Sequence, residues 1–304
     1  MKMAMADTFA PADPAGRLGA GSPAARAAGR WLPRIVVYGL PAALILAPLT
    51  AFLMTGFWSM ADGQVVHRFT LANYAAFLDQ PSYIRVFLGT LQLAGIVAAV
   101  GLVFGYIIAY LIWRLEGRVR YFMLLFSVIP LAMNTIVKIY AMRNILGFNG
   151  ILNWALVSTG ILDAPSKLFI FNQTAVMITM AVIYLPYAIL PIFLSLERIP
   201  PSLAAASADL GARPGQTFRT VVLPLSLPGS IVGGLFVMVL ALGDFLTPQM
   251  VGGNQGFTFG RAIWSQFGMA FNWPFGAALA VVLLLAVAAV IGLAALVSRH
   301  ARVK

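Results

Sequence analysis

The feature that most constrains this chain is a series of six long apolar blocks separated by short polar stretches. They cover approximately residues 35–60, 87–113, 121–140, 174–196, 223–246 and 275–297. Each block is long enough for a helix to cross about 30 Å of hydrocarbon. A segment inside lipid must satisfy its own backbone groups, so each block is predicted to be helical. The expected fold class is all-α: a polytopic membrane protein with about six transmembrane helices.

Composition agrees with a membrane setting. Of the 304 residues, 61% are hydrophobic and only 10% are charged, which is too little charge to cover a soluble domain of this size. The net charge of +11 could suggest nucleic acid, but most cations lie in short stretches between the apolar blocks. That placement is typical of a topology signal, so no nucleic-acid partner is expected.

The distribution of Lys and Arg predicts the orientation. With six spans both termini lie on one side, and fourteen cations fall on that side against six on the other. The positive-inside rule then places both termini in the cytoplasm. Residues 1–34 are predicted to be a flexible basic tail, 35–298 the transmembrane domain and 299–304 a short cytoplasmic tail. The first block is too long for the apolar core of a signal peptide, so it is predicted to remain as a span.

Several chemistries are not expected. The chain has no cysteine, and its two histidines, His67 and His300, lie in different segments, so no metal site is predicted. No G-x-x-x-x-G-K-[ST] motif occurs, which argues against nucleotide binding by this chain. No nucleophile–base pair is evident within the spans, and no catalytic residue is predicted.

The loop between the fourth and fifth blocks, about residues 197–224, carries the most information. Ser202 is predicted to cap a short helix over residues 203–210, and Gly211 to end it in a left-handed conformation. Pro214 and Gly215 then turn the chain toward Pro224 at the membrane. The expected result is a short helix of small residues held against the inner face, which another surface could approach closely.

This loop resembles the E-A-A-x₃-G-x₉-I-x-L-P motif of permease subunits of type I ABC importers. The matching positions, with all spacings intact, are Ala205, Ala206, Ser207, Gly211, Val221, Leu223 and Pro224. Asp209 belongs to an Asp-Leu-Gly-Ala form that is common in these permeases. Two places depart from the motif, since Ala205 stands for its acidic residue and Ser207 for its second alanine.

The resemblance extends over most of the chain and is closest to the spermidine/putrescine-type branch. Four shorter motifs carry that part of it, at residues 69–74, 149–153, 185–187 and 243–245. It implies a bacterial inner-membrane importer subunit for a solute such as a polyamine. The implied partners are two ATP-binding subunits that hold ATP-Mg, a second homologous permease and a periplasmic binding protein. The 197–224 loop would be the coupling helix that docks on an ATPase subunit.

Asp244 is the only acidic residue inside a predicted span. A carboxylate there is costly unless it is paired or hydrated, so a role in the substrate pathway is one hypothesis. The alternative is a structural carboxylate that caps a broken helix or pairs with Lys138 or Arg143. Tyr184 and Tyr187, beside prolines of the fourth block, are further pathway candidates.

Two pairs of glycines are spaced as G-x-x-x-G, Gly101 with Gly105 and Gly229 with Gly233. Small residues at this spacing let helices approach closely in lipid, so these pairs are predicted to serve packing. The main alternative function is a secondary transporter driven by an ion gradient. That mechanism normally needs several polar groups near mid-membrane, for which Asp244 alone is thin support.

Overall fold

The computed structural model describes residues 35–302, so the predicted basic tail at 1–34 lies outside the described residues. The chain divides into two units, residues 1–52 and 53–304, which are described separately. In the first unit, a π-helical turn (Ile35–Gly39) leads into α2 (Leu40–Thr55). Helix α2 is apolar along its whole length, as expected for a helix that crosses a membrane.

The first predicted block extends too far. Helix α2 ends at Thr55, and the chain then forms a hairpin of β1 (Ser59–Ala61) and β2 (Gln64–Val66), paired antiparallel with Ser59 opposite Val66. Asp62 and Gly63 form the turn with φ values of 50° and 75°. An Asp-Gly pair favours this kind of tight turn, so the sequence held a signal against extending the span to residue 60.

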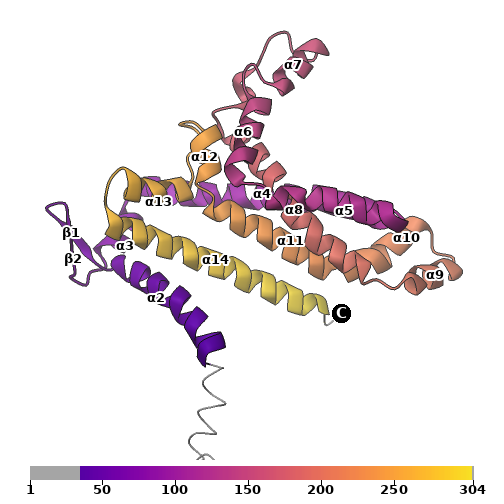
Figure 1. Ribbon diagram of the computed structural model, residues 1–304, viewed down its shortest axis with the longest axis horizontal. Coiled ribbons are helices and arrows are strands. Elements are labelled where there is room, and N and C mark those ends of the chain that lie inside the picture. Colours follow the sequence, from indigo (N-terminus) through magenta and orange to yellow (C-terminus); the bar gives the residue numbers. More distant parts are fainter. Residues whose placement is uncertain (1–34, 303–304) are drawn as a thin grey trace, which may run out of the picture. The chain divides into compact units, whose positions relative to one another are not determined.

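Three long helices form the centre of the second unit (Figure 1): α4 (Pro81–Arg114), α8 (Gln173–Glu197) and α11 (Leu223–Gly243). Each packs on the other two, and α14 (Trp273–Arg302) packs on α11. The end of this bundle that holds the α8–α11 connection is called the α9 end below. The opposite end, which holds α12, is called the α12 end.

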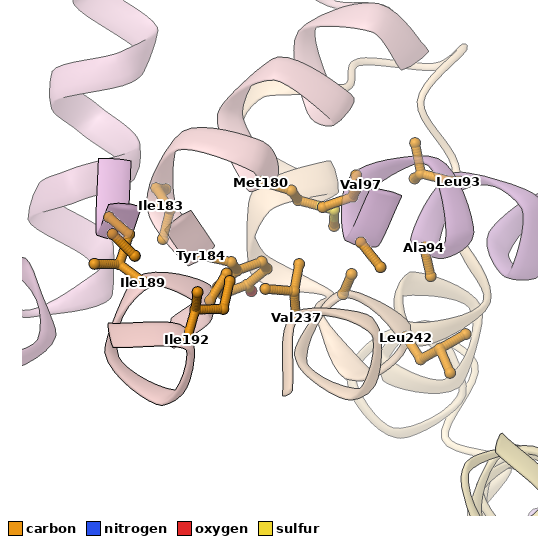
Figure 2. Close-up of a cluster of buried hydrophobic side chains, with 14 of the residues drawn as sticks. Leu93, Ala94, Val97, Met180, Ile183, Tyr184, Ile189, Ile192, Val237 and Leu242 are labelled. Atoms are coloured by element: carbon orange, nitrogen blue, oxygen red, sulfur yellow. The ribbon is translucent and has the colours of Figure 1, made fainter. Parts of the chain in front are cut away.

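The core lies where α4, α8 and α11 meet. Figure 2 shows Leu93, Ala94 and Val97 of α4 beside a group from α8 and two residues of α11. Met180, Ile192 and Val237 are fully buried there. The apolar blocks that supply this core were predicted from the sequence, and α8 and α11 match their predicted bounds to within a few residues.

Glycines bring these three helices into close contact, as predicted. A side chain at Gly233 would place its Cβ 2.9 Å from the backbone oxygen of Ala188, and one at Gly229 would place it 2.5 Å from that of Pro191. A Cβ at Gly105 would lie 2.8 Å from the Cβ of Ala188, and Gly101 faces Val237. The packing role of both G-x-x-x-G pairs is therefore confirmed.

The third predicted block is not one continuous span. Helix α5 (Gly117–Ala132) ends, and α6 (Thr135–Leu146) begins after a bend of 102°. Asn134 caps α6 by accepting a hydrogen bond from the backbone N–H of Ile136 at 2.8 Å, and Lys138 Nζ donates to the backbone oxygen of Pro130 at 3.1 Å. At 1.5 Å per residue α5 is about 24 Å long, short of the full hydrocarbon thickness.

Within residues 35–302, five helices are long and apolar enough to cross a membrane, and the bent pair makes a sixth if it is counted as one span. The prediction of an all-α polytopic protein with about six spans is confirmed, apart from the break in the third.

Short elements connect the long helices on the side away from the α9 end (Figure 1). They are α3 (Ala72–Asp79), α7 (Ile151–Ser158), a 3₁₀ turn (Lys167–Phe169), α12 (Leu246–Val251) and α13 (Phe259–Gly268). Among them, α7 packs on α6 alone of the elements in close contact. Phe77 of α3 and Phe259 of α13 pack with Phe275 and Leu279 of α14 in a second apolar cluster. The hydroxyl of Thr90 accepts a hydrogen bond from the backbone N–H of Phe259 at 2.8 Å, which attaches α13 to α4. Burial raises the pKa of the Tyr74 hydroxyl of α3.

Candidate functional site

The α8–α11 connection contains a short helix, as predicted, but its start differs from the prediction. Helix α9 (Pro201–Asp209) begins after Pro200, whose extended backbone is the N-cap, and no side chain caps it. Ser202 lies inside the first turn and is therefore not the cap. Proline at the first helical position explains the start, because its fixed φ suits a helix and its missing N–H removes a donor that would have no partner.

The C-terminal end of α9 agrees with the prediction. Gly211 has a φ of +81°, in the left-handed region. Its N–H donates to the oxygen of Ala208 at 2.8 Å, and the N–H of Ala212 donates to the oxygen of Ser207 at 3.1 Å. This pair of bonds is a Schellman motif, which satisfies the last carbonyls of the helix and needs a residue without a Cβ at Gly211.

The return to the bundle is helical from Pro214 onward. Helix α10 (Pro214–Thr217) continues through a π-helical turn (Phe218–Val222) into α11, so Leu223 and Pro224 are the first residues of a span. The hydroxyls of Ser207 and Thr217 lie 2.9 Å apart and hydrogen-bond α9 to α10. The serine that replaces an alanine of the motif therefore fixes the angle between the two short helices.

The outer surface of α9 is small and exposed. Ala205, Ala206 and Asp209 are all exposed, so backbone can approach this face closely. Two large apolar side chains accompany them: Leu203 is 42% exposed and Leu210 is 89% exposed. Single exposed apolar side chains are common on protein surfaces, so these two are candidates for docking only because of the motif positions beside them.

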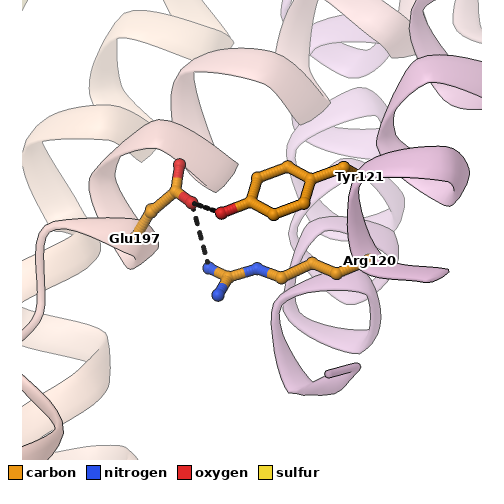
Figure 3. A network of polar contacts seen from close by, with 3 residues as sticks. All are labelled: Arg120, Tyr121 and Glu197. Atoms are coloured by element: carbon orange, nitrogen blue, oxygen red, sulfur yellow. Dashed lines mark hydrogen bonds and ion pairs between the residues drawn. The ribbon is translucent and has the colours of Figure 1, made fainter. Parts of the chain in front are cut away.

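A polar network fixes the start of this loop, and sequence reasoning missed it. Glu197, the last residue of α8, accepts a hydrogen bond from the Tyr121 hydroxyl at 3.1 Å and pairs with Arg120 Nη2 at 3.6 Å (Figure 3). The Arg120 guanidinium also lies 5.1 Å from the ring centre of Phe193. The sequence shows one cation and one anion at the facing ends of two neighbouring blocks, and only the antiparallel packing of α5 on α8 joins them.

Asp244 lies where α11 ends and α12 begins, and the residue is only 9% exposed. Its Oδ1 accepts hydrogen bonds from the backbone N–H groups of Leu246 at 2.9 Å and Thr247 at 3.0 Å, and its Oδ2 accepts one from the Tyr184 hydroxyl at 2.7 Å. Both oxygens are thus occupied, and the side chain caps the first turn of α12. No ion pair with Lys138 or Arg143 is formed among the described residues.

The two tyrosine candidates have different surroundings. Tyr184 is buried against Asp244, whereas Tyr187 is half-buried, with its ring 6.2 Å from that of Tyr184. Nearby helices hold two fully buried hydroxyls without a hydrogen-bond partner, those of Thr179 in α8 and Thr247 in α12. Neither threonine was predicted, because a hydroxyl within an apolar block, like that of Thr179, or just after one, like that of Thr247, gives no signal of burial. In the described part of the chain no group of three His, Asp or Glu side chains could hold a metal ion.

Residues 101–303 match the family model described as "Binding-protein-dependent transport system inner membrane component". The chain is 34% identical over 250 residues to the spermidine/putrescine transport system permease protein PotB of Escherichia coli (strain K12), covering 82% of this chain and 90% of that one. It is 35% identical to PotB of Haemophilus influenzae, over 78% of this chain and 82% of that one. It is also 35% identical to the E. coli inner membrane ABC transporter permease protein YdcU, over 79% and 80% of the two chains.

Solved structures show the same fold. A chain of a bacterial ABC transporter that imports the acidic polysaccharide alginate superposes with a TM-score of 0.71, covering 92% of this chain and 98% of that one at 13% identity. A chain of the MetNI methionine ABC transporter gives a TM-score of 0.57 at 19% identity, over 72% and 95% of the two chains. The family model and the curated relatives confirm the resemblance to permease subunits of ABC importers, and these structures agree with it in fold. The chain belongs to the binding-protein-dependent transport system inner membrane component family, the permease subunits of ABC importers.

Proposed function

We propose that this permease carries polyamines such as spermidine and putrescine, and that the loop of α9 and α10 receives the movement of an ATPase subunit. The polyamine assignment is supported by the named relatives, which resemble this chain over about four fifths of its length. The chain performs no bond chemistry in this scheme. ATP-Mg binds to two partner subunits, and a second, homologous permease completes the path.

The geometry of α9 is the observation that carries the coupling proposal. This helix is exposed at one end of the bundle, where a short turn joins it to α8 and a second short turn, followed by continuous helix from Pro214, joins it to α11. Those two helices pack closely along their length. A force on α9 therefore acts on the two central helices together, which is the mechanical property that a coupling element needs.

The orientation of the chain in the membrane follows from the same scheme. An ATPase that uses cytoplasmic ATP requires the α9 end to face the cytoplasm, which agrees with the cation count. The α12 end then faces the periplasm, where a binding protein would deliver the solute. Residues 197–224 form the proposed coupling loop, with Leu203 and Leu210 added to the motif positions as apolar contacts.

The contacts of Asp244 favour the structural alternative for this carboxylate. Three donors already occupy its two oxygens. Tyr184 is one of these donors, so its hydroxyl also serves the structure around Asp244. Tyr187, which keeps part of its ring exposed, is the stronger pathway candidate of the three. Asp244→Asn keeps an acceptor for the α12 cap, so unchanged affinity and rate for a cationic substrate are expected. A large rise in KM without loss of stability would instead assign Asp244 to the pathway.

Uptake into proteoliposomes tests the main proposal. The complete transporter, with both permeases and the ATPase, should accumulate radiolabelled putrescine or spermidine when the binding protein is outside the vesicles and ATP is inside, and not without ATP. A protonophore should have no effect. Uptake that collapses with the protonophore and ignores ATP would support the secondary transporter, and ATP-driven uptake of a different solute would remove only the polyamine assignment.

Co-purification tests the docking surface. Leu210→Asp places a charge in the proposed apolar contact and should release the ATPase, whereas Leu71→Asp is a matched control. Leu71 is 59% exposed and precedes α3 at the α12 end, so the same change there should leave the ATPase bound. Retention of the ATPase by both variants would contradict the coupling assignment.

A further inference from the structure

A cleft of about 630 Å³ opens at the α9 end and reaches the first turn of α9. One wall is the end of α4 and its turn into α5, and the other is the start of the coupling loop from Glu197 to Ala204. The coupling motif explains neither the volume of this cleft nor its charge.

Three arginines line the cleft, Arg114, Arg118 and Arg120, against two glutamates, Glu116 and Glu197. Glu197 is already engaged by Tyr121 and Arg120. Even so, the Nε and Nη2 atoms of Arg120 are buried without a hydrogen-bond partner. Arg114 and Arg118 take part in no ion pair within the part of the chain that the structure describes. The guanidinium groups of Arg114 and Arg118 are therefore outside any ion pair in the described residues, and such groups match the oxygens of a phosphate in geometry and charge.

An apolar track leads away from this cleft along α5. Tyr121 lines the cleft, and Leu125 and Ile129 follow it at one-turn intervals on the same helix face. These side chains are 58%, 58% and 49% exposed, and α5 buries none of its residues. A ligand that fits both parts needs an anionic group in the cleft and an apolar chain along α5, and a phospholipid has both.

We propose that this cleft binds an anionic phospholipid of the inner leaflet, with its phosphate among Arg114, Arg118 and Arg120 and an acyl chain along Tyr121, Leu125 and Ile129. Basic pockets between transmembrane helices on the cytoplasmic side are suited to such headgroups. The lipid would bridge the α4–α5 turn to the first residues of the coupling loop. This site does not depend on the identity of the transported solute.

Short-chain lipids test the proposal on the purified full-length chain in neutral detergent. Dioctanoyl phosphatidylglycerol should raise the melting temperature, and dioctanoyl phosphatidylcholine should not. The double variant Arg114→Gln/Arg118→Gln should weaken the apparent affinity for phosphatidylglycerol about tenfold or more, as expected for two cations near a lipid headgroup. Glu116→Gln, which removes a like charge from the rim, should strengthen it.

A charge-matched control separates a site from general attraction. Arg213→Gln/Arg219→Gln removes two exposed cations from the same end of the bundle but outside the cleft, so its affinity should stay within about twofold of the unmodified chain. Equal weakening by both double variants would overturn the proposal. If the cleft variant fails to fold, Leu115→Trp fills the cleft while keeping every charge, and it should weaken binding as well.

The same experiments distinguish a phospholipid from two other occupants of the cleft, a free anion and a segment of the ATPase. Inorganic phosphate at the same concentrations should not match the effect of phosphatidylglycerol, and an equal response would assign the cleft to a free anion. An acidic segment of the ATPase could also fill a basic cleft. In that case Arg114→Gln/Arg118→Gln would release the ATPase while leaving the lipid response unchanged, and the lipid proposal would be wrong.

Discussion

Helices α8 and α5 come from apolar blocks of similar character, yet they have opposite positions in the molecule. Helix α8 buries twelve of its residues between α4 and α11, whereas α5 buries none and ends at a sharp bend. In lipid both faces of a helix are apolar, so hydropathy shows that a segment enters the membrane but not what it packs against. The difference arises from small residues on neighbouring helices, which let α8 approach closely.

The largest expected effect is on the free energy of unfolding, in a comparison of one phenylalanine from each helix. Phe193 of α8 is fully buried, and Phe126 of α5 is 68% exposed. Phe193→Ala should lower the free energy of unfolding by about 3–5 kcal/mol because it leaves a cavity in the core, and Phe126→Ala should change it little. Melting temperatures of the purified variants measure both. Similar losses would show that α5 is packed as tightly as α8.

A second pair compares two tyrosines that donate to carboxylates. Tyr184→Phe removes a donor from the buried Asp244 and should cost about 1.5–3 kcal/mol, as expected for a hydrogen bond to a charged group. Tyr121→Phe removes a donor from Glu197, where the Tyr121 ring is 58% exposed, and should cost less. The same thermal measurement applies. A larger loss for Tyr121 would reverse the ranking of the two helices.

A glycine substitution tests the close contact of α11 with α8. Gly229→Ala forces a methyl group against the backbone oxygen of Pro191 and should cost about 1–3 kcal/mol from overpacking. Gly95→Ala in α4 is the matched control, because nothing lies within 4 Å of the added carbon and helix propensity favours alanine. If Gly229→Ala were as stable as the control, the helices would not be in backbone contact.

The smallest expected effect concerns the end of α5. Lys138→Met removes the cation that donates to the backbone oxygen of Pro130 in the last turn of α5, where a positive charge is favourable. A loss of about 0.5–1 kcal/mol is expected, together with faster proteolysis of the α6–α7 segment. An unchanged proteolysis rate would indicate that Asn134 and Pro130 alone maintain the bend.

Much of this molecule could be predicted from its residues. Block lengths located the spans, the G-x-x-x-G pairs identified the tight contacts, and Gly211 marked the end of α9 because only glycine takes a φ of +81° without strain. The break at Met133 was missed because Pro130 and Asn134 lie within a run that remains apolar overall. The start of α9 was misplaced because a serine was preferred as the cap over a proline pair.

The candidate site was harder to predict than the fold. The spacing of the loop positions located α9, but the Ser207–Thr217 and Glu197–Tyr121 contacts join residues that are 10 and 76 positions apart. Asp244 could be recognised as costly within a span, yet the two alternatives could not be ranked from the sequence. Ranking them required the positions of its donors, which depend on where α11 ends and how α12 turns.

The glycine contacts between α8 and α11 have a consequence for the mechanics of the protein. Where backbone lies directly on backbone, no flexible side chain remains between the helices to absorb a displacement by changing rotamer. The two helices should then tilt as a single stiff lever, with little energy lost in deforming their interface. A push of a few ångströms on one end would reappear at the other, and soft elements such as the α5–α6 bend would be left to accommodate it.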